Sequence, residues 1–274
     1  MADQLFEMTW VVATDGYRWI DAVLPKIGKH PVLTTGIPLG QEFEWKTYPP
    51  LKRYPDLFLR FAKLSPKRKA IQVFANTYGL LGIMEPIPVK ISAKERLVGS
   101  GDPFYEWHDE ILRMRAAIKI WTDLKTAGEA EDWTDRQKDL QKNLQKLINA
   151  RLEKWCSARL LLRKEDQLDF YVVPQTLIGA FWLQLARAVT KHKDYRPCLA
   201  CRSMIEISLD QTGKREDTLY CSPACRQRDH RLRKEGKSLY RNGMTMPQIG
   251  KRLSRDVAII KKWSQRWRRK KRRR

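Results

Sequence analysis

The chain has 274 residues, of which 42% are hydrophobic, and it carries a formal net charge of +23. This is enough apolar material for a sizeable core and one or two domains. The longest apolar stretch, residues 177–189, contains Gln184 and Arg187 and is too short to span a membrane, and the N-terminus lacks the basic start of a secretory signal. We therefore expect a cytoplasmic, nucleoid-associated protein with reduced cysteines and no membrane partner.

Residues 1–190 are predicted to form a mainly helical domain with minor β-structure, so that the fold class is mainly α (α+β). The proline-punctuated residues 1–55 are predicted to be irregular and partly extended, with short apolar runs such as Trp10–Ala13 as candidate strands, and a further strand is expected at residues 89–91. Apolar periodicity and start signals predict helices at residues 56–62, 66–78, 102–127, 134–155 and 175–190. Residues 160–162 and 169–173 resemble two short strands with a turn at residues 165–167.

The long apolar stripes of residues 107–124 and 140–155 favour helices that pack against each other. Residues 1–190 show no nucleophile pair, phosphate-binding glycine loop or metalloprotease motif, and we predict no catalytic residues. This domain could bind an unknown small ligand or form a homodimer, and the sequence does not choose between these roles.

Positive charge is concentrated at the C-terminal end. Residues 226–274 contain twenty Lys or Arg and three Asp or Glu, which leaves a net charge of only +6 on residues 1–225. Such a cationic segment beside a nearly balanced body indicates a polyanionic partner, which it would bind in a salt-dependent manner.

Four cysteines lie in two close pairs, and a fifth, Cys156, is expected to be a core residue. Their spacing is C-x2-C, nineteen residues, then C-x3-C, and it allows four thiolates to converge on one structural Zn²⁺; the predicted ligands are Cys198, Cys201, Cys221 and Cys225. His230, five residues after Cys225, is an alternative ligand.

Around these ligands, residues 191–196 are interpreted as a linker. Residues 205–209 are expected to form a hairpin that turns at 211–214 and returns at 218–220. Ser222-Pro223 suits the start of a helix that carries Cys225.

The stretch Tyr220–Arg233, Y-C-S-P-A-C-R-Q-R-D-H-R-L-R, resembles the zinc ribbons of bacterial CGNR-type putative transcription regulators. The similarity covers about residues 197–234, and residues 61–82 are more loosely similar to the regions that accompany such ribbons. After Cys225 the chain has Arg226-Gln227-Arg228 where that group has Gly-Asn-Arg. The resemblance implies DNA binding and transcription regulation.

Residues 237–267 resemble the helix-turn-helix of resolvase-like regulators, whose second helix lies in the major groove. Thr245 and Gln248 predict a capping box, Gly250 permits close helix approach, and residues 254–256 make the turn, with Ser254 in the place of the usual glycine. The expected apolar set is Ile249, Leu253, Ile260 and Trp263. The bases are expected to face Arg255, Asp256, Ala258, Ile259, Lys261 and Lys262.

The sequence thus predicts four segments: a domain at 1–190, a zinc ribbon with a basic helix at 191–236, a helix-turn-helix at 237–267, and a disordered basic tail at 268–274. The predicted nucleic-acid contacts are Arg226, Arg228, Arg231, Arg233, Lys251, Arg252, Arg255, Lys261, Lys262, Arg266 and Arg268. The preferred hypothesis is a zinc-containing regulator that binds double-stranded DNA and is not an enzyme. RNA binding is the alternative, and a zinc-associated nuclease of a mobile element, dependent on Asp229, is a third.

Overall fold

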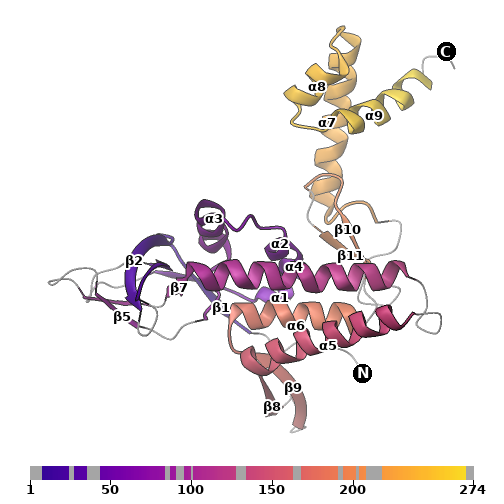
Figure 1. The fold of residues 1–274 in the computed structure, drawn as a ribbon. Coiled ribbons are helices and arrows are strands. Elements are labelled where there is room, and N and C mark those ends of the chain that lie inside the picture. Colours follow the sequence, from indigo (N-terminus) through magenta and orange to yellow (C-terminus); the bar gives the residue numbers. More distant parts are fainter. Residues whose placement is uncertain are drawn as a thin grey trace. The chain divides into compact units, whose positions relative to one another are not determined.

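The computed structural model has a mixed α+β fold, mostly helical with small antiparallel sheets (Figure 1). The chain divides into two compact units, Met1–Lys193 and Asp194–Arg274, each described separately below. The structure describes residues 8–24, 28–35, 44–83, 87–90, 96–99, 101–127, 134–162, 168–190, 194–201, 204–207 and 218–269.

Three helices form the centre of the N-terminal unit: α4 (Phe104–Thr126), α5 (Asp135–Trp155) and α6 (Leu177–Thr190). They lie side by side in Figure 1, and each was predicted within a few residues. Their apolar stripes are buried, and Trp107 and Trp182 are fully enclosed. A capping box between Thr134 and Gln137 begins α5, because it satisfies backbone N–H groups that the first helical turn leaves unpaired.

Three short helices complete this core: α1 (Pro50–Arg53), α2 (Leu57–Ala62) and α3 (Arg68–Tyr78). The ring of Phe61 in α2 lies 5.0 Å from that of Phe181 and 6.1 Å from that of Trp107, in an aromatic cluster that joins α2, α4 and α6. The predicted start of α3 at Pro66 is wrong by two residues, because Lys67 is the extended N-cap residue. Its predicted end is confirmed: Gly79 follows at φ 94°, a conformation that favours glycine.

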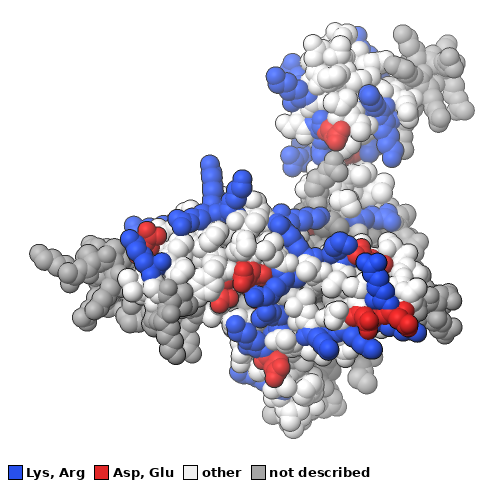
Figure 2. Space-filling view, viewed as in Figure 1, with Lys and Arg blue, Asp and Glu red and all other residues white. Residues whose placement is uncertain are grey.

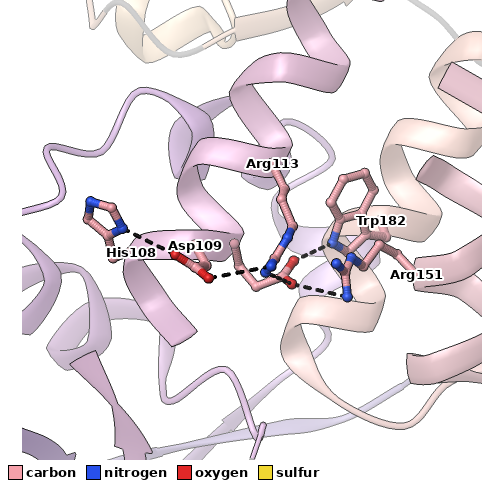
Figure 3. A network of polar contacts seen from close by, with 6 residues as sticks. His108, Asp109, Arg113, Arg151 and Trp182 are labelled. Carbon is pink, nitrogen blue, oxygen red and sulfur yellow. Dashed lines mark hydrogen bonds and ion pairs between the residues drawn. The ribbon is translucent and has the colours of Figure 1, made fainter. Parts of the chain in front are cut away.

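A buried carboxylate connects the three central helices. Glu110 of α4 accepts a hydrogen bond from the Trp182 indole of α6 at 3.0 Å, and pairs with Arg113 at 3.2 Å and Arg151 of α5 at 3.5 Å (Figure 3). Asp109 bridges Arg113 and His108 beside it. Because Glu110 is only 1% exposed, these partners offset the cost of burying its charge.

Four small antiparallel sheets complete the N-terminal unit. β1 (Trp10–Ala13) pairs with β4 (Trp45–Tyr48), and β3 (Gly28–Thr34) lies between β2 (Arg18–Leu24) and β7 (Gly101–Pro103). The other two are hairpins: β5 (Ile87–Lys90) with β6 (Arg96–Gly99), and β8 (Cys156–Leu162) with β9 (Leu168–Pro174). The predicted strand at 10–13 and the pair near 160–173 are confirmed, and the predicted turn at 165–167 lies outside the described residues.

The C-terminal unit contains β10 (Asp194–Pro197), β11 (Met204–Ile207), α7 (Pro223–Arg241), α8 (Met246–Arg252) and α9 (Val257–Arg269). α7 runs without a break across residues 236–237, the predicted boundary between the ribbon and the helix-turn-helix. α9 includes Arg268 and Arg269, which the sequence assigns to a disordered tail; residues 270–274 lie outside the described residues.

Throughout the described part of the chain, no helix is both long and apolar enough to cross a membrane.

Candidate metal centre and cationic helix pair

The four cysteines predicted as ligands lie together in the C-terminal unit. Their sulfurs lie within 4.8 Å of one another, and Sγ of Cys221 lies 3.4 Å from those of Cys201 and Cys225. Sulfurs at about 2.3 Å from one tetrahedral zinc ion would be about 3.8 Å apart, whereas a disulfide requires about 2.05 Å. The arrangement is therefore consistent with one structural metal ion, such as zinc, and not with disulfides.

Backbone hydrogen bonds join the two cysteine pairs. The N–H of Leu199, between the first two cysteines, donates to the carbonyl of Leu219 at 3.0 Å, and the N–H of Cys221 donates to Sγ of Cys198 at 3.4 Å. As predicted, Ser222 begins the following helix: its hydroxyl accepts the Cys225 N–H at 3.2 Å, with Pro223 at the first helical position. The second pair thus lies at a helix N-terminus, which favours thiolates.

Burial and crowding oppose deprotonation of the four thiols. Cys198 is buried, and the other three cysteines lie closer to the surface. Burial first, and then hydrogen bonds to the neighbouring sulfurs, raise the pKa of the Cys221 thiol to about 12. Four thiols this close are therefore expected to deprotonate together only when a cation compensates their charge.

The β-structure around the cysteines differs from the prediction. Residues 191–196 were interpreted as a linker, but Asp194–Pro197 is strand β10 and pairs with β11 in register Pro197↔Met204, so the first cysteine pair itself lies in the hairpin turn. The expected return strand at 218–220 is not a strand, and the expected turn at 211–214 lies outside the described residues.

The apolar core beneath this hairpin is very small. It consists of Cys198, Ala200, Ile205 and Ile207, with Tyr220, Cys221 and Cys225 packed against it. A module with so few apolar side chains cannot offset the entropy of folding, and a metal ion would supply the missing stability. His230 is exposed on α7 and is not a member of the ligand cluster found among the described residues.

Helices α8 and α9 are joined by a short turn, at the place where the sequence predicts one. The Thr245–Gln248 capping box is present, and Ile249, Leu253, Ile260 and Trp263 are buried together as expected. A Cβ atom on Gly250 would lie 2.9 Å from the carbonyl oxygen of Arg255, which explains why glycine stands there. The Asp256 carboxylate accepts the Ala258 N–H at 2.8 Å and caps the start of α9.

The exposed face of α9 is polar and cationic. Ala258, Lys261, Lys262 and Gln265 are exposed at steps of three and four residues, opposite the buried Ile260, Trp263 and Ser264. Figure 2 shows Lys and Arg side chains on the visible face of this unit, with few acidic ones. The other predicted contacts that are exposed are Arg226, Arg228, Arg231, Lys251 and Arg252. The side chains of Arg266 and Arg268 lie outside the described part of the structure.

Two predicted nucleic-acid contacts instead have partners inside the unit. The Arg233 guanidinium pairs with the buried Asp229 at 2.6 Å and lies 5.6 Å from the Trp263 ring centre, and the Tyr220 hydroxyl donates to the same carboxylate at 2.7 Å. The Arg255 guanidinium donates to the carbonyls of Ala200 at 2.8 Å and Leu199 at 3.4 Å. Neither link, both of which connect the cysteine module to α9, was predicted from the sequence.

No protein-family model matches the chain, and neither a curated protein nor a solved structure matches it.

Proposed function

We propose that the protein is a zinc-containing protein that binds double-stranded DNA and regulates transcription. The observation that carries this proposal is the exposed face of α9, where Lys261, Lys262 and Gln265 share one side of a helix that follows a short turn. The major groove of B-DNA admits one α-helix, and Lys and Gln side chains can hydrogen-bond to guanine and adenine edges there.

The remaining exposed cations suit phosphate contacts. Arg226, Arg228 and Arg231 of α7 and Arg252 of α8 belong to the same compact unit as α9. Arg and Lys contacts to phosphate position a protein on the duplex and release counterions, but they do not read sequence. The metal in this proposal is structural, because four sulfur ligands fill a tetrahedral zinc site.

The proposed role in regulation rests on the resemblance to the CGNR-type ribbons. The nuclease alternative depends on Asp229, whose carboxylate is buried and bound by Tyr220 and Arg233. Because this carboxylate is occupied, no observation on this unit favours the nuclease alternative over DNA binding.

The first experiment is a gel-shift competition between duplex DNA and structured RNA with the zinc-loaded full chain, at about 0.15 M salt. We expect duplex DNA to compete more strongly. In a double variant with Lys261→Ala and Lys262→Ala, binding to duplex DNA should weaken, by about 1–3 kcal/mol for each base contact that is lost.

The matched control is the double variant with Lys142→Ala and Lys146→Ala, which removes the same charge from an exposed face of α5. It should bind DNA like the parent chain. Stronger competition by RNA, or equal weakening in the two double variants, would contradict the proposal that α9 binds duplex DNA.

A further inference from the structure

A side chain of the helix-turn-helix reaches the loop that carries the metal ligands. The two terminal nitrogens of the Arg255 guanidinium donate to the carbonyls of Leu199 and Ala200, and these two residues are the whole of the loop between Cys198 and Cys201. Arg255 is half-buried, so this contact is partly shielded from water. A planar guanidinium has the fork geometry to bind two adjacent carbonyl oxygens, which a lysine ammonium lacks.

The two acceptor carbonyls are in place only while the cysteine loop keeps its shape. That loop rests on a small apolar core, and a metal bound to Cys198 and Cys201 would fix the residues at both of its ends. Without the metal, the small core has little to hold the loop, because in modules of this size metal binding and folding are one process. Loss of the metal would therefore also remove the acceptors of Arg255.

The backbone of Arg255 lies two residues before the start of α9 at Val257. Its backbone N–H donates to the Gly250 carbonyl of α8 at 2.8 Å, and the next residue, Asp256, caps the first turn of α9. A displacement of Arg255 would therefore move the N-terminus of α9. In a recognition helix, the N-terminal residues are the ones that contact base edges. The Arg233 side chain over Trp263 supports α9 further along and is a separate contact.

We infer that Arg255 is a positioning residue that couples occupancy of the four-cysteine metal site to the placement of α9, rather than a residue that reads a base. The inference rests on the proposed function, because α9 is taken as the helix that enters the groove. Under this inference, sequence-specific binding depends on the metal. The phosphate contacts from α7 and α8 depend on the metal less strongly. Coupling is reciprocal in binding free energies, so Arg255 should also tighten zinc binding. We expect most of this change in affinity to appear as slower zinc release.

The test compares Arg255→Ala and Arg255→Lys with the control Arg252→Ala, which removes the same charge from the exposed surface of α8. The first readout needs no DNA: the rate at which zinc passes from the full chain to a chromogenic chelator. Groups that hydrogen-bond to a metal-binding loop typically alter metal affinity about 10- to 100-fold. We expect zinc release about tenfold faster in both Arg255 variants and unchanged in Arg252→Ala.

The second readout is the ratio of affinities for a selected duplex site and for random duplex DNA. Both Arg255 variants should lower this ratio, with the preference relaxed at every base pair of the site. Because Arg255→Lys retains the positive charge, its DNA binding should keep the salt dependence of the parent chain. The control should weaken both affinities alike. Unchanged zinc release together with a relaxed preference at a single base pair would overturn the inference and make Arg255 a base contact.

The two hypotheses fail in different ways. If zinc release accelerates in the Arg255 variants but no form of the protein prefers duplex DNA, the link between Arg255 and the metal loop stands and the proposed function is wrong. If the parent chain binds a duplex site specifically and the Arg255 variants release zinc at the parental rate, the proposed function stands and the coupling is wrong.

Discussion

Ser254, in the turn between α8 and α9, is the only non-glycine residue with a positive φ in the described part of the chain, at 50°. A side chain in this left-handed region costs about 1–2 kcal/mol, and glycine avoids this cost but loses more entropy on folding. We therefore expect Ser254→Gly to raise the free energy of unfolding of the C-terminal unit by up to about 1 kcal/mol. Urea unfolding of the zinc-loaded chain measures this change.

The matched control for this substitution is Ser238→Gly, at an exposed position inside α7. Glycine there should lower the free energy of unfolding by up to about 1 kcal/mol, because helical backbone favours other residues. Equal destabilisation by both substitutions would mean that the turn at Ser254 is not strained.

Asp102 of β7 is a buried aspartate whose carboxylate binds the backbone of the segment that follows α3. Its carboxylate accepts the N–H groups of Leu81 at 2.5 Å and Ile83 at 3.0 Å, yet burial, the largest cause, raises the pKa of Asp102 to about 6. The folded state thus holds the proton more tightly than the unfolded chain. The resulting stability is complete below about pH 4 and is lost as the pH rises through about 6, an effect of about 3 kcal/mol.

The substitution Asp102→Asn removes this titration. We expect the variant to be less stable than the parent chain near pH 4, because its amide can accept only through one oxygen. It should lack the decline of the parent chain between about pH 4 and 7, so the difference between the two should shrink or reverse towards pH 7. Chemical unfolding of both proteins across this pH range measures the difference. Asp15→Asn, at an exposed turn, serves as control. A constant difference between Asp102→Asn and the parent chain would refute the raised pKa.

At the scale of elements, Gly250 sets how closely α8 approaches the turn before α9. Replacing an exposed helical glycine by alanine usually stabilises a helix by up to about 1 kcal/mol. At Gly250 the new methyl group would lie 2.9 Å from the Arg255 carbonyl oxygen, a backbone atom that cannot rotate away. We therefore expect Gly250→Ala to lower the free energy of unfolding by about 1–3 kcal/mol.

Thermal or urea unfolding of the zinc-loaded protein measures this effect. Lys251→Ala, one residue further along α8 and exposed, should change the free energy of unfolding by no more than about 0.5 kcal/mol. A Gly250→Ala variant more stable than the parent would show that the turn and α8 are further apart than the structure places them.

The longer helices were predictable from sequence because their signals are local, whereas the short helix α1 was missed. The stripe of α5 and its Thr134–Gln137 capping box, or the Thr245–Gln248 box of α8, can be read within one segment. Strand β10 was not predictable in this way. Residues 194–197 have no apolar alternation and become a strand only through pairing with β11 across the cysteine turn. Likewise β2 and β3 were missed among the prolines of the first 55 residues, as their pairing is a tertiary property.

At the candidate site, the cysteine spacing was sufficient to predict the ligand set. Each short spacing places two sulfurs close together, and two such pairs supply the four ligands of a tetrahedral site. The charged residues were different. Arg233 and Arg255 have the same sequence context as the exposed arginines around them, and only the fold shows that Asp229 and the loop of Leu199 and Ala200 are their partners. Net charge therefore predicted the cationic segment but not which of its members are exposed.

At the scale of the whole molecule, the division into two units separates two sources of stability. The N-terminal unit has a core of buried aromatic and aliphatic side chains around α4, α5 and α6. The cysteine module of the other unit depends on few apolar residues, and structural zinc in such modules is worth about 10–16 kcal/mol. Removing the metal should therefore unfold the cysteine module and leave the N-terminal core intact.

Differential scanning calorimetry of the full chain, with and without a strong zinc chelator, measures this separation. We expect two transitions in the zinc-loaded protein, of which the chelator abolishes or lowers only the one that belongs to residues 194–274. Cys221→Ser should reproduce the effect of the chelator and reduce the zinc content found by native mass spectrometry below one ion per chain. One cooperative transition that shifts as a whole would mean that the two units unfold together.

Cys156 provides the internal control, because it is the one cysteine outside the cluster. It is half-buried at the start of β8, where burial raises the pKa of its thiol to about 11 and its Sγ lies 3.7 Å from the Gly179 carbonyl oxygen. Cys156→Ser should leave the zinc content and the C-terminal transition unchanged and shift only the N-terminal transition. Both substitutions remove a thiol, but only Cys221→Ser removes a predicted ligand. A loss of zinc in Cys221→Ser alone would therefore show that the metal binds in the C-terminal unit.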